Sequence, residues 1–520
     1  MTGSDLGRLF TPRSIAVLGA SASADKLGGQ VFGRLASSFK GELIAVNPSE
    51  TAIAGRPSVP SLRDLPSPVD LVVALLPGEA LVEAIEQCPQ GQAAFLLAIP
   101  SGFGEVAHEG PALQRRLAEA AHRVGMRVVG PNCVGMLNMD AGLNASIIPL
   151  MPPGGRPGLG IATQSGGFGM ATAMYACDNG LAISSFCDVG NTVDVSLADC
   201  VHHLAADPAT GVIGLYVESV RDTAGFQRAV EQAARRKPVI LCPLARSPAG
   251  QAASLSHVGI AADGVLLVQA ARAAITVDSG LDLLHVAKML LWQAPRTLRG
   301  RRLAVVTGTG GIGTEIADLA SEQGLAVHRF SERLSKAIAH HLPPYAASGN
   351  PVDLTPVWRD YPELYPLVIE EIARSGEADL IAVSITDVPT TRPDLARSLA
   401  RTIPRLGVPT AVYWASRDSD VANMAPLQVA RVPCYRATRE LALALAAVAR
   451  SDTSCTEGRE SQVRQHRRTT DRRPRFRQSP DAETGGPCCP CGAGRAPSRS
   501  RAAGNRRRAP FPAIRVRAIP

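Results

Sequence analysis

The eight residues SIAVLGAS, numbers 14–21, decide the fold of this 520-residue chain. An apolar run over residues 15–18 is ended by small residues over 19–21, which is the pattern of a buried strand followed by a tight turn. Apolar residues at helical spacing follow over residues 31–35. Small residues between a strand and a helix let backbone N–H groups approach a phosphate at the helix N-terminus. The stretch therefore predicts the opening of a nucleotide-binding α/β domain of the Rossmann type.

Four more apolar runs follow the first, and each one stops at small or turn-forming residues. The predicted strands span residues 43–46, 71–76, 94–99 and 127–129, and their turns begin at Asn47, Pro77, Pro100 and Gly130. Since the carboxyl ends of parallel strands meet at one edge of a sheet, these turns predict a ligand pocket along that edge, with Lys26 near the phosphates. Ordinary turn chemistry is the alternative, and it explains any one turn better than all five.

This edge does not have the pattern of a NAD site. The turn after the first strand lacks the GxGxxG sequence, and the second strand ends in Asn47-Pro48, where a NAD-binding domain has an acidic residue for the ribose 2′-OH. The sequence therefore favours a nucleotide-like ligand other than NAD.

A second strand-to-helix series begins at residue 158. The apolar strand 158–162 runs into the small residues 165–167 (SGG) before a helix over 170–179. Small residues at a helix N-terminus offer free N–H groups to an anion. We therefore expect a second phosphate-binding turn here.

His257 is the candidate catalytic residue of this second series. It lies in SLSHVG, residues 254–259, after an apolar strand predicted over 238–244, so we expect it in a loop at the carboxyl edge of the sheet. Glu218 ends the preceding predicted strand and is placed to pair with the imidazole, which orients the ring and favours its charged form. The alternatives are a solvated loop histidine and a plain exposed carboxylate.

A third series opens with an apolar strand over 303–307 and a glycine-rich turn, GTGGIG, over 308–313. A glycine-rich strand-to-helix turn is by itself a weak signal. The sequence NPVD at 350–353 and alternating helices and strands continue the α/β pattern to about residue 450.

The net charge of +8 suggests nucleic acid, but the excess is confined to residues 451–520. That segment holds 16 Arg, no Lys and 6 acidic residues, whereas residues 1–450 hold 38 basic and 40 acidic residues, a balance of −2. The segment has no hydrophobic period and is rich in Arg, Pro, Gly and Ser, which predicts disorder or an off-frame end. The alternatives are a basic nucleic-acid arm, or a metal site at its CCPC sequence (488–491), although no paired CxxC supports zinc.

Composition narrows the class of protein further. No run of 18 apolar residues is present and residues 1–9 lack the layout of a signal peptide, so we expect a cytoplasmic protein. Eleven cysteines scattered through apparent strands and helices are typical of reduced core residues.

The ordered set of motifs resembles the NDP-forming acyl-CoA synthetases, typified by ADP-forming acetate:CoA ligase, and more distantly succinyl-CoA ligase. The motifs are GAS at 19–21 with Lys26, VNP at 46–48, GFGE at 102–105, GPNC at 130–133, SGG at 165–167, GN at 190–191, SH at 256–257 with Gly259, GG at 310–311 and NPVD at 350–353. Two positions depart from the family pattern. Val258 stands where the family usually has Thr after its histidine, and Gly308 stands where it has Asn.

The resemblance implies an α/β fold of three domains and a tail. Residues 1–150 are expected to form a Rossmann-like CoA-binding domain, 151–296 and 297–450 two flavodoxin-like, succinyl-CoA-synthetase-like domains with parallel sheets, and 451–520 a disordered or off-frame tail. His257 is expected to carry a phosphoryl group, with Glu218 as its partner. The residues expected at the phosphate are Ser165, Gly166, Gly167, Gly310 and Gly311; those expected at CoA are Gly19, Ser21, Lys26, Val46, Pro48, Pro77, Ser101 and Asn132.

The implied reaction interconverts a small carboxylic acid, CoA and NTP with acyl-CoA, NDP and phosphate. The family also needs an ATP-grasp module for the nucleotide and Mg²⁺, and residues 1–450 do not supply it. The chain is therefore expected to be an α-type subunit with an ATP-grasp β-type partner in an α2β2-like assembly, or a fused enzyme cut short by a frameshift, with no metal, nucleic acid or membrane site of its own. The alternatives are a non-catalytic CoA-binding regulatory protein and, more remotely, a NAD-dependent oxidoreductase.

Overall fold

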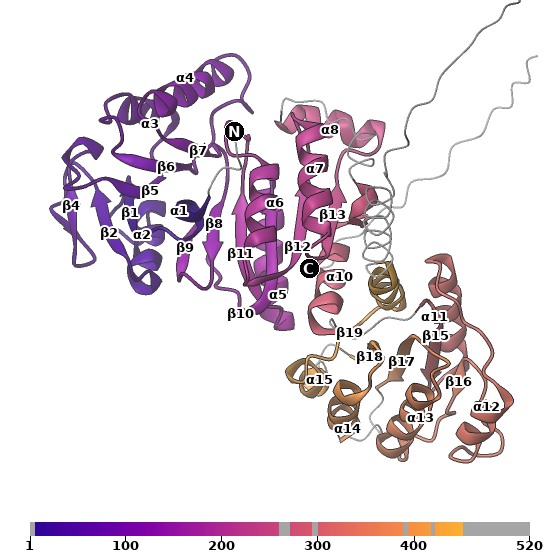
Figure 1. The fold of residues 1–520 in the computed structure, drawn as a ribbon. Helices are drawn as coiled ribbons and strands as arrows, with labels where there is room; N and C mark the ends of the chain where they lie inside the picture. The colour runs from indigo at the N-terminus through magenta and orange to yellow at the C-terminus, as the bar shows by residue number, and fades with distance from the viewer. Residues whose placement is uncertain (1–5, 259–270, 294–299, 388–393, 418–421, 451–520) are drawn as a thin grey trace, which may run out of the picture. The chain divides into compact units, whose positions relative to one another are not determined.

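The computed structural model describes residues 6–258, 271–293, 300–387, 394–417 and 422–450. The predicted tail over 451–520 lies outside these ranges. The described residues form three β-sheets flanked by helices (Figure 1). None of the helices in these ranges is both long enough and apolar enough to cross a bilayer.

The first sheet has seven strands in the order β3-β4-β2-β1-β5-β6-β7, and all its pairs are parallel except β3 with β4. Its strands are β1 (Ser14–Leu18), β2 (Glu42–Val46), β3 (Ala52–Ile53), β4 (Arg56–Val59), β5 (Val69–Ala74), β6 (Ala93–Ala98) and β7 (Arg127–Val129). Its helices are α1 (Gly7–Phe10), α2 (Leu27–Ser38), α3 (Gly78–Glu86) and α4 (Gly110–Arg123). The chain first winds from β1 to β2 and β4 on one side, and later to β5, β6 and β7 on the other side of β1. The loops after β1 and β5 therefore flank a topological switch point, where open α/β sheets bind ligands.

The second sheet has the order β14-β13-β12-β10-β11-β8-β9. Its strands are β8 (Gly135–Asn138), β9 (Leu143–Ser146), β10 (Gly154–Thr163), β11 (Ile183–Asp188), β12 (Thr210–Val217), β13 (Val239–Pro243) and β14 (Ile275–Thr276). Its helices are α5 (Gly166–Asn179), α6 (Leu197–Ala206), α7 (Thr223–Ala234), α8 (Pro248–Val258) and α10 (Gly280–Gln293). Strands β8 and β9 are antiparallel and join this sheet through β11, although they precede the domain boundary predicted at residue 150.

The third sheet is parallel throughout, in the order β16-β15-β17-β18-β19. Its strands are β15 (Leu303–Thr307), β16 (Val352–Asp353), β17 (Leu380–Thr386), β18 (Thr410–Ala415) and β19 (Cys434–Tyr435). Its helices are α11 (Gly310–Glu322), α12 (Glu332–Ala339), α13 (Tyr361–Ser375), α14 (Asp394–Thr402) and α15 (Ala425–Val429), and residues 438–450 are also helical. The predicted fold class, a Rossmann-like domain followed by two parallel-sheet domains, is confirmed.

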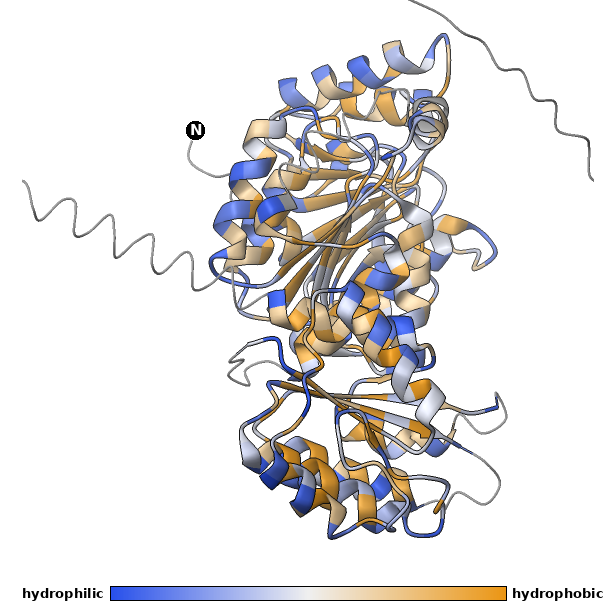
Figure 2. Ribbon diagram, turned by 90° about the vertical axis from the view of Figure 1, so that its right-hand side faces the viewer, coloured by the Kyte–Doolittle hydropathy of each residue, from blue (hydrophilic) through white to orange (hydrophobic). Residues whose placement is uncertain are grey.

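The apolar runs of the sequence become strands that are buried on both faces. In β1, Ile15 and Val17 belong to one core cluster while Ala16 and Leu18 belong to another, on the opposite face of the sheet. Figure 2 shows the strands largely in hydrophobic colours, with hydrophilic residues mainly on helices and loops. Helices on both sides of a parallel sheet require such continuous runs, and therefore the functional polar residues gather at the strand ends.

Candidate functional site

A cavity of about 560 Å³ lies at the switch point of the first sheet and is lined by the loops after β1, β2, β4 and β5. It brings together five of the residues predicted to bind CoA: Gly19, Ser21, Lys26, Val46 and Pro48. Lys26 is the N-cap residue of α2 and is exposed. Its ammonium group and the first N–H groups of the helix therefore offer positive charge to the same opening of the cavity. Arg63 also lines the cavity and adds a second cation that the sequence analysis missed.

Close packing explains the small residues around this cavity. Gly19 has a φ of +88°, and a methyl group on Gly28 of α2 would lie 2.0 Å from the Gly19 carbonyl oxygen. Only a glycine lets the helix approach the turn this closely. The Asn47 side chain donates to the Ala20 carbonyl at 2.8 Å and accepts from the Ser49 N–H at 2.8 Å, so it joins the loops after β1 and β2 rather than replacing an acidic ribose ligand.

The other three residues predicted at CoA stand at the ends of the next three strands of the same sheet. Pro77 is the N-cap of α3 after β5, Ser101 is exposed after β6, and Asn132 follows β7. They are not among the residues that line the 560 Å³ cavity. Because parallel strands are spaced by ~4.8 Å, the end of β7 lies about 14 Å from the end of β1 along the sheet edge.

Asn132 connects the first sheet to the second. Its φ is +59°, and its side-chain amide donates to the Asn191 carbonyl oxygen at 3.2 Å. Asn191 donates in turn to the Glu105 carboxylate at 2.6 Å and to Gln114 at 2.9 Å. Burial opposes ionisation of Glu105, but the hydrogen bond from Asn191 outweighs it with the help of backbone N–H donors and lowers the pKa of the carboxyl group.

The second sheet presents its glycine-rich turn at the end of β10. Ser165 is the N-cap of α5, and its hydroxyl accepts from the Phe168 N–H at 3.4 Å, while the Thr163 hydroxyl accepts from the Ser165 N–H at 2.9 Å. Gly166 and Gly167 occupy the first helical positions, so α5 begins four residues before the helix predicted over 170–179. The geometry presents helix N–H groups at the carboxyl edge of the sheet.

Glu218 is buried at the end of β12, with 8% of its surface exposed. Gln164, directly after β10, fixes the backbone there because its side-chain carbonyl accepts from the N–H groups of Glu218 and Ser219 at 3.0 and 3.1 Å. The Gln164 amide donates to the Thr192 hydroxyl at 3.2 Å. Gln164 therefore ties the ends of β10 and β12 to the loop after β11, a role that the sequence analysis missed.

Asp188, at the end of β11, is fully buried on the other side of β10 from Glu218. Its carboxyl oxygens accept from the N–H groups of Val134 at 2.8 Å and Gly190 at 3.1 Å. Burial raises the pKa of Asp188 to about 7, and the nearby Glu218 charge adds to this shift. No motif in the sequence indicates this residue, because a single aspartate in an apolar strand matches no known pattern.

His257 lies in α8 (Pro248–Val258), so the prediction that it belongs to a loop is wrong for its backbone. The small residues around it, which are also typical of a loop, instead continue the helix that follows β13. Its side chain lies outside the described residues, and the predicted pairing with Glu218 stays a prediction.

The third sheet presents a similar turn at the end of β15. Thr309 is the N-cap of α11, and Gly310 and Gly311 are its first helical residues. The departure at Gly308 has a structural reason, since a methyl group there would lie 2.2 Å from the Tyr361 hydroxyl. That hydroxyl donates to the Thr355 carbonyl at 2.9 Å, so the tyrosine occupies the space of a larger side chain.

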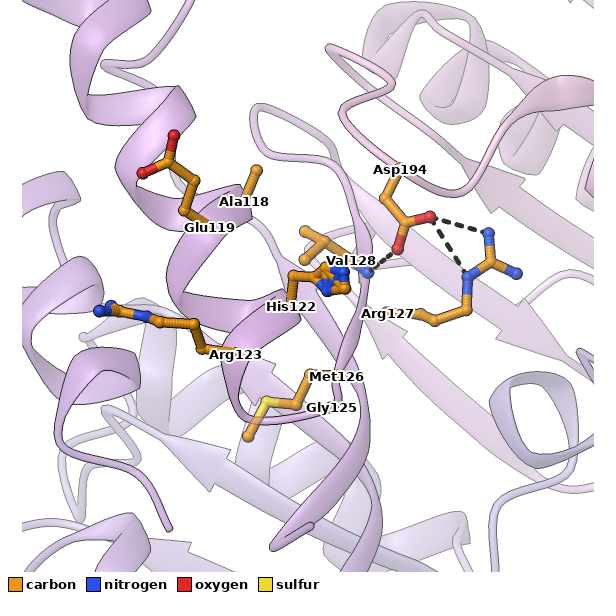
Figure 3. Close-up of a pocket in the computed structure, with 9 residues that line it drawn as sticks. All are labelled: Ala118, Glu119, His122, Arg123, Gly125, Met126, Arg127, Val128 and Asp194. Carbon is orange, nitrogen blue, oxygen red and sulfur yellow. Dashed lines mark hydrogen bonds and ion pairs between the residues drawn. The ribbon is translucent and has the colours of Figure 1, made fainter. Parts of the chain in front are cut away.

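Another cavity, of about 1000 Å³, contains none of the predicted site residues. It lies beside the start of β7, where Arg127 and Asp194 meet the end of α4 (Figure 3). The Asp194 carboxylate accepts from the Val128 N–H at 2.8 Å and from the Arg127 guanidinium at 2.9 Å. These bonds join the first sheet to the loop after β11 and favour a structural role for this region.

Comparison with known proteins agrees with this architecture. The CoA binding domain matches residues 13–139, the succinyl-CoA ligase like flavodoxin domain residues 156–290, and the Ligase-CoA domain residues 303–371. The chain is 30% identical over 451 residues to the subunit alpha of acetate–CoA ligase [ADP-forming] II from Pyrococcus furiosus, covering 84% of this chain and 96% of that one. It is 33% identical over 350 residues to acetate–CoA ligase [ADP-forming] I from Archaeoglobus fulgidus, covering 67% of this chain and 50% of that one.

A solved structure agrees as well. The dinucleotide forming acetyl-coenzyme A synthetase 1 of Ca. Korarchaeum cryptofilum, in complex with phosphate and ADP, matches with a TM-score of 0.80 and 29% identity, over 87% of this chain and 99% of that one. Fold, domain order and sequence identity therefore agree along nearly all of the described residues. The chain belongs to the NDP-forming acyl-CoA synthetase family, among the relatives of its α subunits.

Proposed function

We propose that this chain is the α-type subunit of an NDP-forming acyl-CoA synthetase that interconverts carboxylate, CoA and NTP with acyl-CoA, NDP and phosphate. The observation that carries the proposal is the contact between two sites. The CoA-side residue Asn132 bonds Asn191, in the loop that Gln164 ties to Glu218. A thiol delivered along the first sheet thus reaches the edge of the second sheet where the phosphate turn lies. The ATP-grasp partner, its Mg²⁺, the α2β2-like assembly and a cytoplasmic location are parts of the same proposal.

The proposed reaction runs through two phosphorylated species. A neutral imidazole nitrogen of His257 takes the terminal phosphoryl group of NTP and releases NDP. A carboxylate oxygen of the acid then takes the phosphoryl group from His257 to form an acyl phosphate. The CoA thiolate attacks the acyl carbon and expels inorganic phosphate, and each step is reversible.

The residues of this chain have separate roles in those steps. Glu218 orients the imidazole of His257. The amides of α5 after Ser165 and of α11 after Thr309 stabilise the phosphoryl charge, because helix N-termini are donors that need no reorganisation. Lys26 and the other residues of the 560 Å³ cavity hold the nucleotide end of CoA.

Labelling with radioactive phosphate tests the central step. Acyl-CoA plus labelled phosphate is expected to label the isolated chain without a partner, through the acyl phosphate, with acid-labile and base-stable label. His257→Ala is expected to abolish labelling while CoA binding is retained, and Glu218→Gln is expected to slow it, because the ring loses its orienting group. If His257→Ala labels at the wild-type rate, or if the wild type never labels with a panel of acyl-CoAs, the carrier assignment fails and a non-catalytic CoA-binding protein is the better description.

Calorimetric titration tests the first site. CoA is expected to bind and Lys26→Ala to weaken it, because the variant removes a cation beside the phosphates. Tight NAD binding without CoA binding would contradict the assignment.

A further inference from the structure

A buried lysine lies where elements of the second and third sheets meet. Lys288 belongs to α10, and only 3% of its surface is exposed. Its ammonium group donates to the Cys434 carbonyl oxygen in β19 at 2.8 Å and to the side-chain oxygen of Asn179, the last residue of α5, at 3.2 Å. One side chain therefore joins two helices of the second sheet to an edge strand of the third.

Two aromatic rings complete the surroundings of this cation. The Lys288 Nζ atom lies 4.6 Å from the centre of the Tyr435 ring and 5.6 Å from that of the Tyr175 ring, at distances where the face of a ring attracts a cation. The Tyr435 hydroxyl donates to the His285 carbonyl oxygen of α10 at 3.0 Å, so β19 and α10 bond each other in both directions. Within the described ranges, none of the carboxylates forms an ion pair with Lys288.

The titratable groups that face Lys288 offer little compensating charge. Burial, and then the Lys288 charge, lower the pKa of His285 to about 3, so this imidazole is neutral. Glu440, whose carboxylate lies 3.8 Å from His285 Nδ1, has a pKa that burial raises. Burial also lowers the pKa of Lys288 to about 8, although Cys434 and Glu440 oppose this shift. Burial raises the pKa of the remaining groups, which are therefore neutral near pH 7: Tyr175, Tyr435 and Cys434. A cation in these surroundings costs stability.

The rest of this junction is largely apolar. Leu290 of α10, Leu303 of β15 and Leu445 of the helix over 438–450 belong to one continuous core cluster. Gln293 is the other buried polar side chain of α10 that reaches the third sheet, where it accepts from the Thr410 N–H at 3.1 Å. Apolar contact is non-directional and specifies an orientation weakly. A single buried polar residue can fix the arrangement of an apolar interface at a cost in stability.

The orientation of the third sheet sets the relation between the two glycine-rich turns. Helix α5 begins at the turn after β10 and ends at Asn179, beside Lys288, whereas α11 begins at the turn after β15. We propose that Lys288 is a positioning residue that fixes the third sheet in one orientation on the second and thereby sets the distance between these two turns. Its consequence for turnover rests on the proposed synthetase activity. The orientation itself is measured without turnover.

The orientation experiment measures a distance in the full chain by double electron–electron resonance. Spin labels are carried by a non-natural amino acid at two exposed positions, Arg228 of α7 and Glu322 of α11, so that the native cysteines stay unlabelled. The wild type is expected to give one narrow distance distribution. Lys288→Met keeps the apolar stem and removes the charge, and it is expected to give a broadened distribution or a second distance.

Lys237→Met is the matched control. Lys237 also donates to main-chain carbonyl oxygens, those of Leu204 at 2.8 Å and of Asp207, but all three residues belong to the second sheet and its helices. The control is expected to keep the wild-type distribution. Asn179→Ala removes one acceptor of the Lys288 ammonium group and provides a second test if Lys288→Met does not fold, and it is expected to broaden the distribution in the same way.

Unfolding in urea between pH 7 and 10 tests whether the charge is enclosed. The pKa of Lys288 is about 8 in the folded chain and about 10.4 in an unfolded one. The unfolded chain therefore binds more protons between these values, and the folded state gains stability as the pH rises. The unfolding equilibrium constant of the wild type, relative to that of Lys288→Met, is expected to fall by up to about tenfold per pH unit between about pH 8 and 10.

Phosphate labelling tests the consequence for turnover. Lys288→Met is expected to lower kcat by about tenfold and to leave KM for acyl-CoA within about twofold, because the CoA site lies in the first sheet. Its melting temperature is expected to equal or exceed that of the wild type. Slower labelling by a chain that is not less stable is a combination that lost stability alone does not produce.

The outcomes separate this inference from the proposed function. If no acyl-CoA labels any chain while the distance distributions differ as expected, the synthetase proposal fails and the positioning role of Lys288 stands. If Lys288→Met, or Asn179→Ala in its place, gives the same distance distribution as Lys237→Met, the inference is overturned whatever the labelling result. A ratio of unfolding constants that does not change with pH would show that the charge is not enclosed, which also overturns it.

Discussion

Two glycine-rich turns, one before α5 and one before α11, share a local design and differ in their surroundings. Each follows a strand that ends in threonine, and the hydroxyl groups of Thr163 and Thr307 accept from the N–H two residues later, at 2.9 and 3.1 Å. Each continues with two glycines in the first helical positions. An aspartate ends the neighbouring strand in both cases, Asp188 in β11 and Asp353 in β16.

The surroundings close the first turn and leave the second one open. The Ser165 hydroxyl caps α5. In the part of the chain that the structure describes, which includes the whole first turn of α11, the Thr309 side chain accepts no hydrogen bond from the first N–H groups of that helix. Asp188 is fully buried and holds two amides of neighbouring loops, whereas Asp353 is partly exposed and holds the Thr355 N–H at 2.9 Å. The comparison shows that one local sequence pattern can lie in two surroundings: the turn before α5 is held by its side-chain cap and a buried carboxylate, whereas the turn before α11 has no side-chain cap and a partly exposed carboxylate beside it.

The largest expected effect is a pH dependence of the free energy of unfolding, which arises from the buried Asp188 at the closed turn before α5. Burial raises the pKa of Asp188 to about 7 in the folded chain, whereas an unfolded aspartate titrates near 3.9. The folded chain therefore holds this proton more tightly, and the resulting stabilisation is full below about pH 4 and is lost as the pH rises to about 7. Relative to Asp188→Asn, the free energy of unfolding of the wild type should fall by up to about 4 kcal/mol across that range.

Urea unfolding of both chains at pH values from 4 to 7 measures this difference. Asp353→Asn is the matched control, because water reaches that side chain at the open turn. A constant difference between wild type and Asp188→Asn over the whole range would contradict the account of the closed turn.

A smaller effect is expected from crowding the glycines of the closed turn. A methyl group on Gly166 would lie 2.3 Å from Val134 Cγ1, whereas one on Gly167 meets its nearest neighbour, Ser165 Oγ, at 4.0 Å. Because the stiff Val134 side chain has to move, Gly166→Ala is expected to lower the free energy of unfolding by about 1–3 kcal/mol. Gly167→Ala is the control and should leave stability unchanged or raise it slightly. Equal melting temperatures for the two variants would show that Val134 does not restrain the turn.

The sequence predicted the turns well because each is a local pattern. Continuous apolar runs can only be strands with both faces covered, so their ends, and the pocket residues Gly19, Lys26 and Pro48, followed from the alternation of strands and helices. The two glycine-rich strand-to-helix turns before α5 and α11 were predicted for the same reason, and their binding of phosphate stays a prediction.

What the sequence did not reveal depends on contacts between distant segments. Asp188 and Gln164 gain their roles from partners 54 residues away, and the space for Gly308 is set by Tyr361, 53 residues later. The helix around His257 was missed because small residues favour loops and helix N-termini about as much as they tolerate helices. Local sequence patterns do not encode these contacts or this helix, because packing between segments distant in the sequence determines them.

The smallest expected effect concerns the open turn, and it separates anion binding from folding. A methyl group built at Gly311 meets no other described atom within 4 Å, so Gly311→Ala should leave the melting temperature unchanged or slightly higher. The same methyl group would stand at the opening where a phosphoryl group approaches the first amides of α11, and we expect phosphate labelling to slow by about tenfold, or about 1.4 kcal/mol of transition-state stabilisation.

Gly376→Ala at the far end of α13 is not a suitable control, because its φ of +71° would add strain. Gly33→Ala in α2 is suitable, since its position is also open and helical but lies on the first sheet. If Gly311→Ala labels as fast as Gly33→Ala, the open turn does not contact the phosphoryl group, and α5 alone has to stabilise it.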